Sequence, residues 1–383
     1  MTLEEDALDL HSRNPGKISV EASVDISSKD DLNLVYTPGV AEPCKEISKD
    51  KSKAYNYTSK SNLVAVVSDG SAVLGLGDIG AEASMPVMEG KANLLKKFGD
   101  VDGFPLVVDT GDSEEIIETV ERVAPTFGAV NLEDIKAPEC FEIEEKLKER
   151  LGIPVFHDDQ HGTAIVVLAA LKNSLEIVEK DLADVKVTVL GSGAAGVAVS
   201  KFLDDAGVGE VLVVDSSGII SSDRGNSHKQ RLAERLGINE EGSMEDAIEG
   251  SDVVIGLSTG GIVSKQMVES MNEDSIVFAL ANPEPEIHPE EAREAGAEIV
   301  ATGRSDYSNQ VNNSLVFPGV FRGALNAGAT EINEEMKKEA SEAVAESIKP
   351  EKDMIVPNTL DKELAMEIAT RVEKAARETG VVR

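Results

Sequence analysis

The chain has 383 residues, of which 41% are hydrophobic, so it is long enough for two domains with sizeable cores. Acidic residues number 71 against 37 basic ones, and the resulting net charge of −34 repels nucleic acid and anionic membranes, which excludes both as expected partners. No apolar run reaches the ~18 residues that span a bilayer, and the acidic N-terminus MTLEEDALDL differs from a basic signal peptide. The sequence therefore predicts a soluble, cytoplasmic protein.

The acidic residues are spread along amphipathic segments such as PECFEIEEKLKERLG and are not gathered in a tail. We interpret this charge as adaptation to concentrated salt, where screening removes self-repulsion. Lysine is more frequent than arginine, which weakens a halophile assignment, and an acidic interaction protein is the alternative. The two cysteines, Cys44 and Cys140, are too few for a disulfide framework and are predicted to be buried small hydrophobes.

Short apolar runs alternate with helical patterns along the chain, which predicts parallel βαβ units. The runs of the first half are NLVAVVSDG, FPLVVDTGD, GAVNLEDIK and GIPVFHDDQ. Those of the second half are DVKVTVLGSG, EVLVVDSSG, DVVIGLSTG, SIVFALANP and AEIVATGRS. The helical pattern TAIVVLAALKNSLEIV lies between the two sets and is the expected link between two sheets. Beyond FPGVFRGALNAGA the chain is rich in Ala, Glu and Lys and is predicted to be helical.

The sharpest motif of the second half is VTVLGSGAAGVAVSKFLDDAG followed by EVLVVD. A strand here runs into three glycines and a helix, and the next strand ends in Asp215. Such glycines allow a tight turn and close approach to a pyrophosphate at the helix N-terminus, while the acid bonds the adenosine ribose. The predicted dinucleotide-binding loop consists of Gly191, Ser192, Gly193, Ala194, Ala195 and Gly196. A tight turn without a ligand is the alternative.

These patterns together predict an α/β protein with three parts. Residues 1–160 form an N-terminal α/β domain with a parallel sheet, and residues 161–320 form a Rossmann-type NAD(P)-binding domain. Residues 321–383 form C-terminal helices that pack back on the body.

A second run of three glycines occurs at Gly75, Gly77 and Gly80. The next acid that ends a strand, Asp109, lies 34 residues beyond Gly75, whereas the dinucleotide fingerprint has its acid about 20 residues on. We therefore do not predict a second dinucleotide site and expect these glycines to let the backbone approach the substrate or the dinucleotide. The helix predicted after them carries Lys91.

Four acids follow two strands of the first half. Glu133 and Asp134 end GAVNLED, and Asp158 and Asp159 end GIPVFHDD. Ligands of open parallel sheets bind beyond the carboxyl ends of the strands, so the four acids are expected at one edge of one sheet. Clustered carboxylates repel one another unless a cation or a proton compensates, and hard oxygen ligands suit Mg²⁺ or Mn²⁺. Solvated loop acids are the alternative.

His157 and His161 are four residues apart, a spacing that binds zinc when both lie on one helix. The run before them is a strand, so the pair straddles a strand-to-helix junction and does not share a face. We expect both histidines to form hydrogen bonds within the turn.

At this point the sequence resembles the malic enzymes of the short bacterial and archaeal type. The resemblance covers about residues 10 to 330. It rests on eight motifs in the family's order and spacing: YTPGVAEPC, VVSDGSAVLGLGDIG, MPVMEGKANLLKKFG, NLEDIKAPECF, VFHDDQHGTA, VLGSGAAG, ANPEPEI and VNNSLVFPGVFRGAL.

The resemblance implies oxidation of L-malate with NAD(P)⁺, decarboxylation of the bound oxaloacetate and protonation of the enolate to give pyruvate. By residue-wise match it implies that Glu133, Asp134 and Asp159 hold a divalent metal ion, which polarises the substrate's C2 oxygen.

The same match gives roles in proton transfer. Lys91 matches the family's general base, and Tyr36 matches the acid that protonates C3 of the enolate. Asp158 would orient or tune Lys91. A lysine acts as a base near neutral pH only if burial or a nearby cation lowers its pKa, and the metal ion would supply the second.

Asn282 and Asn313 match positions that bond the substrate's carboxylate and hydroxyl groups, and Asn282 would also touch the nicotinamide. Asn312 is an alternative to Asn313. The long eukaryotic enzymes carry a substrate-binding arginine where this chain has Ala72. Lys136 is one candidate for that missing anchor.

The coenzyme preference depends on the segment after Asp215. This acid ordinarily favours NAD, because it bonds the ribose hydroxyls and repels a 2′-phosphate. The same acid occurs in NADP-using members of the family, and Arg224, Lys229 and Arg231 follow it. We lean towards NADP.

Three alternatives stay open. A malolactic enzyme shares the motifs but releases lactate without net oxidation. A plain malate dehydrogenase would accumulate oxaloacetate, and a nicotinamide-sensing protein would keep the glycine loop without catalysis. The family also implies a homodimer or higher oligomer, with the N-terminal segment at the interface.

Overall fold

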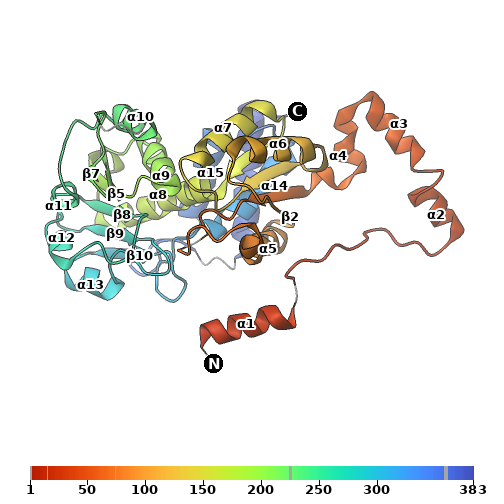
Figure 1. The fold of residues 1–383 in the computed structure, drawn as a ribbon. Helices are drawn as coiled ribbons and strands as arrows, with labels where there is room; N and C mark the ends of the chain where they lie inside the picture. Colours follow the sequence, from red (N-terminus) through yellow and green to blue (C-terminus); the bar gives the residue numbers. More distant parts are fainter. Residues whose placement is uncertain (1, 15, 74, 224–226, 358–360) are drawn as a thin grey trace.

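The computed structural model describes residues 2–14, 16–73, 75–223, 227–357 and 361–383. The body contains two sheets, one fully parallel and one mixed, and an N-terminal arm extends from it (Figure 1). All nine strands predicted from the apolar runs are present, so the α/β fold with a Rossmann-type second half is confirmed. The short strand β7 (Gly218–Ile219) was not predicted.

The first sheet has four parallel strands in the order β2-β1-β3-β4. Residues 64–67 of its interior strand β1 are apolar and fully buried, as an interior parallel strand requires. The strands are β1 (Leu63–Ser68), β2 (Asp102–Val107), β3 (Ala129–Leu132) and β4 (Val155–His157). The helices between them are α5 (Ala81–Gly99), α6 (Ser113–Val123) and α7 (Glu139–Arg150).

The second sheet has the order β10-β9-β8-β5-β6-β7, with β7 antiparallel at one edge. Strand order reverses at β5, which places the ligand crevice of a doubly wound sheet beyond that strand. The strands are β5 (Lys186–Leu190), β6 (Glu210–Asp215), β7, β8 (Val253–Gly256), β9 (Ile276–Ala279) and β10 (Ile299–Thr302). The helices are α9 (Ala194–Asp205), α10 (Ser227–Leu236), α11 (Met244–Ile248), α12 (Lys265–Glu269) and α13 (Pro289–Glu294).

Helix α8 (Asp158–Val178) links the two sheets. It is long and apolar enough to cross a membrane, but 67% of its most apolar window is buried inside the protein. The same apolar faces therefore serve as core, and α8 is a core helix rather than a membrane span.

Three C-terminal helices, α14 (Phe317–Ala327), α15 (Glu334–Glu346) and α16 (Lys362–Glu378), pack against one another and on α5 and α8. Glycines set these distances, because a Cβ on Gly319 would lie 2.7 Å from the Ala365 carbonyl oxygen and one on Gly323 would lie 2.5 Å from that of Ala369. This packing brings the segment around Asn313 onto α5, the helix of Lys91.

The arm consists of the described residues 2–14 and 16–53 and contains α1 (Leu3–Arg13), α2 (Lys29–Val35) and α3 (Ala41–Lys49), with α4 (Ala54–Tyr57) joining it to the body. Cys44 lies on α3 and is exposed, so its predicted burial was wrong, because α3 has no core to pack against in the single chain. Cys140 is buried as predicted.

Candidate active site

The acids of the first half meet at the carboxyl edge of the first sheet. Strands β3 and β4 run side by side in parallel, with Leu132 opposite His157, so the residues that follow them leave the sheet together. The Asp134 N–H donates to Asp159 Oδ2 at 2.9 Å, and one carboxylate oxygen from each of Glu133, Asp134 and Asp159 lies within 4.8 Å of the others. The expected convergence is confirmed for these three acids.

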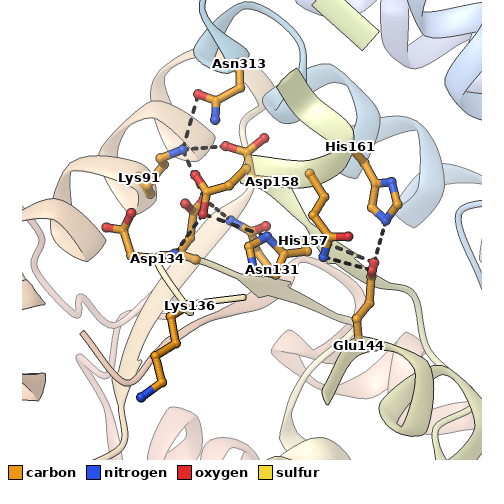
Figure 2. Close-up of polar contacts among 12 residues, drawn as sticks. Lys91, Asn131, Asp134, Lys136, Glu144, His157, Asp158, His161 and Asn313 are labelled. Carbon is orange, nitrogen blue, oxygen red and sulfur yellow. Dashed lines mark hydrogen bonds and ion pairs between the residues drawn. The ribbon is translucent and has the colours of Figure 1, made fainter. Parts of the chain in front are cut away.

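The fourth acid, Asp158, faces Lys91 instead (Figure 2). Lys91 donates to the Asp158 carboxylate, lies 3.1 Å from Glu133 Oε1 and 3.4 Å from Asn313 Oδ1. Its ammonium also stands 4.9 Å from the ring centre of Phe317, the first residue of α14. Only 14% of the Lys91 side chain is exposed, so this is a buried ion cluster rather than a surface pair.

Burial and charge oppose each other in this cluster. Burial disfavours the ammonium of Lys91, but the carboxylates of Asp158, Glu133 and Asp159 outweigh it and raise the lysine pKa. Burial raises the pKa of Glu133 well above its usual range, and Lys91 only partly offsets this. Burial likewise raises the pKa of Asp158. The cluster holds more carboxylates than one lysine can balance.

The excess carboxylate charge of this cluster fits a hard divalent cation. Glu133 Oε2 and Asp158 Oδ1 are buried without a hydrogen-bond partner among the described residues. All donors are carboxylate oxygens, the ligand type of Mg²⁺ and Mn²⁺. The Asp158 carboxylate also needs Gly162, whose Cβ would lie 2.0 Å from Asp158 Oδ1. Glu133, Asp134 and Asp159 are therefore able to hold such an ion.

The two histidines do not form hydrogen bonds within the turn, and that prediction was wrong. His161 Nε2 lies 2.7 Å from Glu144 Oε1 of helix α7, and its Nδ1 lies 3.3 Å from Lys337 Nζ of α15. Both ring nitrogens of His157 are buried with no hydrogen-bond partner among the described residues. Burial lowers the pKa of His161 to about 4, so the ring is neutral at pH 7.

Glu144 was not singled out from the sequence, yet it joins three elements. It is buried, and its carboxylate accepts the His157 backbone N–H at 3.3 Å as well as the His161 ring. Burial opposes its ionisation, but His161 and Lys148 outweigh it and hold the pKa well below the usual range. Figure 2 shows this carboxylate beside the start of α8. Its hydrogen bonds hold the junction between β4 and α8, which carries Asp158 and Asp159.

The predicted dinucleotide loop lies between β5 and α9 at the reversal of strand order. Gly191 has φ +117°, and a Cβ on Gly196 would lie 1.9 Å from the Gly191 carbonyl oxygen, so both positions require glycine. A Cβ on Gly193 would meet nothing within 4 Å, which leaves space before the α9 N-terminus. Ser192, Ala194 and Ala195 complete this loop. Its shape fits a pyrophosphate.

Asp215 ends β6 and already has a cationic neighbour. Its Oδ2 lies 2.7 Å from Lys229 Nζ, and its Oδ1 accepts the Ser217 N–H at 2.8 Å. Arg231 lies on the same helix as Lys229. Arg224 lies outside the described residues.

The second glycine run belongs to the long connection, residues 69–80, from β1 to α5. A Cβ on Gly75 would lie 2.3 Å from the carbonyl oxygen of Asn282, which follows β9 in the second sheet. The close approach that this glycine allows is therefore to the other half of the protein. In the same connection, Ala72 donates its N–H to the Asp134 carbonyl at 2.9 Å, so the segment also supports the acids.

The remaining candidate residues differ in whether their side chains lie near Lys91. Asn312 accepts the Ser314 N–H as a cap, whereas Asn313 reaches Lys91. Lys136 points away from the cluster (Figure 2). Tyr36 is the C-cap of α2 on the arm and is 65% exposed, and Figure 1 shows α2 far from α5, the helix of Lys91.

Comparisons with known proteins agree with this geometry. The family described as malic enzyme, N-terminal domain, matches residues 15–148, and that described as malic enzyme, NAD binding domain, matches residues 160–377. The bifunctional malic/malolactic enzyme of Bacillus subtilis is 53% identical over 100% of this chain and 95% of its own. The NAD-dependent malic enzyme of Geobacillus stearothermophilus is 53% identical over 96% and 78%, and the NADP-dependent malic enzyme of Halomonas elongata is 45% identical over 98% and 94%.

Among solved structures, the malic enzyme from Pyrococcus horikoshii superposes with a TM-score of 0.95 at 48% identity, covering 100% of this chain and 92% of its own. The match covers the whole of this chain and therefore includes the arm. Both halves of the chain thus match one family. The chain belongs to the malic enzymes, a family of NAD(P)-dependent oxidoreductases.

Proposed function

We propose that this protein converts L-malate to pyruvate and CO₂ with reduction of NAD(P)⁺, in a reaction that needs Mg²⁺ or Mn²⁺. One observation carries the proposal: a buried lysine is paired with Asp158 and Glu133 beside three carboxylates that fit a divalent cation. The neighbouring sheet presents a dinucleotide loop, and Gly75 packs against Asn282 where the two halves meet. A hydroxy acid bound between the two sheets would lie next to the lysine base and next to the coenzyme that accepts the hydride.

Lys91 is the base of this proposal and takes the hydroxyl proton of malate. Asp158 and Asn313 fix its ammonium, while Asn282 and Asn313 bond the substrate's carboxylate and hydroxyl groups. Tyr36 returns a proton to C3 after CO₂ has left. A bound cation on Glu133, Asp134 and Asp159 would polarise the C2 oxygen and offset the carboxylate charge that raises the lysine pKa, and bound NAD(P)⁺ would accept the C2 hydride.

The coenzyme loop consists of Gly191, Ser192, Gly193, Ala194, Ala195 and Gly196. We favour NADP⁺ over NAD⁺, because Lys229 balances the charge of Asp215 and places an ammonium beside the ribose site. Relatives of both specificities are known, so this preference rests on the ion pair.

A malolactic reaction is the second candidate, because the relative of Bacillus subtilis is described as a bifunctional malic/malolactic enzyme. In that reaction pyruvate is reduced again by the same bound coenzyme and leaves as lactate, so no reduced coenzyme accumulates. The ratio of lactate to reduced coenzyme separates the two activities.

The test is an assay of the full chain with L-malate, either coenzyme, and Mn²⁺ or a chelator. Pyruvate formed in step with reduced coenzyme and lost with the chelator supports the proposal, and oxaloacetate as the only product contradicts it. Lys91→Met should lower kcat by about a thousandfold, in the range of a lost general base. The matched control is Lys136→Met, which removes a nearby lysine that points away and should change kcat less than about threefold.

The acidic surface is proposed to be a salt adaptation of a cytoplasmic protein. A net charge of −34 destabilises the compact state by self-repulsion, and the Debye length falls to about 3 Å in 1 M salt. The midpoint of thermal unfolding should therefore rise between about 0.1 M and 2 M KCl. An unchanged or falling midpoint would contradict this interpretation.

A further inference from the structure

The turn after β9 carries Asn282, one of the residues expected to bond the substrate. Asn282 is exposed, whereas Ala281 before it and Glu286 at the end of the turn are buried. The Asn282 amide nitrogen donates to the Leu280 carbonyl at 3.4 Å, which is a long hydrogen bond. The position of this amide therefore depends on the backbone of residues 280–286.

Glu286 holds this backbone with both of its carboxylate oxygens. The residue is 1% exposed, its Oε2 accepts the Ala281 N–H at 3.0 Å, and its Oε1 accepts the Ser258 N–H at 2.9 Å. Ala281 follows β9 and Ser258 follows β8, which is the neighbour of β9 in the second sheet (Figure 1). One carboxylate thus joins the carboxyl ends of two adjacent strands.

The backbone around Glu286 leaves space for this carboxylate. A Cβ on Gly256, the last residue of β8, would lie 2.3 Å from Glu286 Cδ, so a side chain there would displace the carboxylate. The Val263 N–H also donates to the Glu286 carbonyl at 3.0 Å. The segment 258–263 and the turn 281–286 are therefore joined through both the side chain and the backbone of Glu286.

The segment that Glu286 holds also borders the dinucleotide loop. A Cβ on Gly191, the first glycine of that loop, would lie 2.5 Å from the Leu257 carbonyl oxygen and 3.3 Å from Ser258 Cβ. The hydrogen bonds of Glu286 thus connect the residues that pack on the coenzyme loop with the turn that carries Asn282.

The buried carboxylate is unfavourable for stability when taken alone. Burial raises the pKa of Glu286, and the N–H groups of the backbone only partly offset this. A buried carboxylate that is held by neutral donors is more costly than an apolar side chain of the same size. Such a group beside a binding site indicates a role in that site.

We propose that Glu286 is a positioning residue, which fixes Asn282 relative to the coenzyme loop so that its amide meets the substrate and the nicotinamide together. The inference rests on the proposed role of Asn282 in binding the substrate. Glu286 itself touches neither the substrate nor the coenzyme and acts through the backbone N–H groups of Ala281 and Ser258.

The variant Glu286→Gln tests this role with little change of shape. Glutamine has a single side-chain oxygen, so one of the two backbone N–H groups keeps its acceptor and the other faces an NH₂ group. The turn and the segment 258–263 should then separate slightly. We expect kcat/KM for malate to fall roughly tenfold to a hundredfold, in the range of a displacement of about 1 Å between reacting groups. Unchanged kcat/KM in this variant would overturn the inference.

A double-mutant cycle with Asn282→Ala shows whether Glu286 acts through Asn282. Adding Glu286→Gln to Asn282→Ala should lower kcat/KM for malate by less than about threefold further, because the side chain being positioned is already gone. A purely structural role of Glu286 would lower kcat/KM by the same factor in both backgrounds. Additive losses of this kind would therefore overturn the inference.

The matched control is Asp252→Asn, at the opposite edge of the same sheet. Asp252 is 9% exposed and precedes β8, and its Oδ2 accepts the N–H of Lys186, the first residue of β5, at 2.9 Å. It is therefore also a carboxylate that joins two adjacent strands, but far from the coenzyme loop. Its midpoint of thermal unfolding should fall, while kcat/KM for malate should change less than about twofold.

A second variant keeps the inference testable if Glu286→Gln does not fold. Glu286→Asp retains the charge but is one methylene shorter, so it cannot reach both N–H groups, and the same non-additivity with Asn282→Ala is expected. A wild-type protein that forms no pyruvate from malate overturns the proposed function. An active wild-type protein with additive losses in the cycle overturns the positioning role alone.

Discussion

The segments 75–80 and 191–196 carry the same glycine spacing, and each follows the central strand of a parallel sheet. They are built differently. Only three residues separate α9 from β5, so the N-terminus of α9 faces the loop, and Gly196 packs on Gly191. Helix α5 begins only after the long connection 69–80, in which Gly75 packs on Asn282 of the other sheet.

The difference shows that glycine spacing alone does not define a phosphate site. A pyrophosphate needs a helix N-terminus immediately after the strand, because the free N–H groups of the first turn are its ligands. In the longer connection the backbone groups are used otherwise: Ile79 and Gly80 donate to Gly70, and Ala72 donates to Asp134. The same spacing therefore forms a loop that fits a pyrophosphate in one sheet and supports the acids in the other.

Among changes in these two segments, the largest effect is expected from Gly196→Ala. The new Cβ would lie 1.9 Å from the Gly191 carbonyl oxygen, so α9 must move away from the loop. We expect the Kd for NADP⁺ in calorimetry to rise at least about a hundredfold, or about 2.7 kcal/mol.

The matched control is Gly80→Ala, the corresponding glycine of the other segment. Gly80 has φ +82° and open space at its Cβ position, so alanine there strains the backbone by about 1–3 kcal/mol. The free energy of unfolding of the Gly80→Ala variant should fall, while its Kd for NADP⁺ should change less than about twofold. A hundredfold loss of binding in this variant would make both segments coenzyme loops.

The next effect is expected from Gly75→Ala. Its Cβ would meet the Asn282 carbonyl oxygen at 2.3 Å and Pro283 Cδ at 2.5 Å, so the two halves of the site must separate. A displacement of about 1 Å between substrate groups lowers kcat/KM for malate by roughly tenfold to a hundredfold. Coenzyme binding should stay near wild type. Equal losses in kcat/KM and in coenzyme affinity would contradict separate roles for the two segments.

A smaller effect is expected at Asp215 and Asp109, the acids that follow the segments 191–196 and 75–80. Asp215→Asn removes a charge next to Lys229, so the ratio of kcat/KM with NADP⁺ to that with NAD⁺ should rise about tenfold, or about 1.4 kcal/mol. Lys229→Gln should shift the ratio the other way. Asp109 is exposed at the end of β2, and Asp109→Asn should leave the ratio unchanged. A shift with Asp109→Asn would reopen the second segment as a ribose site.

The strands and the acid edge were predictable because their signals are local. Apolar runs mark buried parallel strands, and acids at the ends of adjacent strands such as β3 and β4 must meet at one edge. Glu144 could not be found this way, since it is one of several glutamates in an amphipathic helix, and only the packing of α7 beside β4 makes it a partner of His161. Tyr36 was found by its motif, but its position depends on the fold of the whole arm.

The smallest effect is expected at Gly77, which lies at φ +75° and whose Cβ position meets nothing within 4 Å. Because no atom obstructs a side chain, only the left-handed backbone resists substitution. Alanine there should lower the free energy of unfolding by about 1 kcal/mol, and asparagine, which tolerates this conformation, by less. Denaturant unfolding of Gly77→Ala and Gly77→Asn measures both. Equal stability of the two variants would show that the backbone at Gly77 relaxes, whereas the expected order would show that the connection keeps this turn to place Gly75 against Asn282.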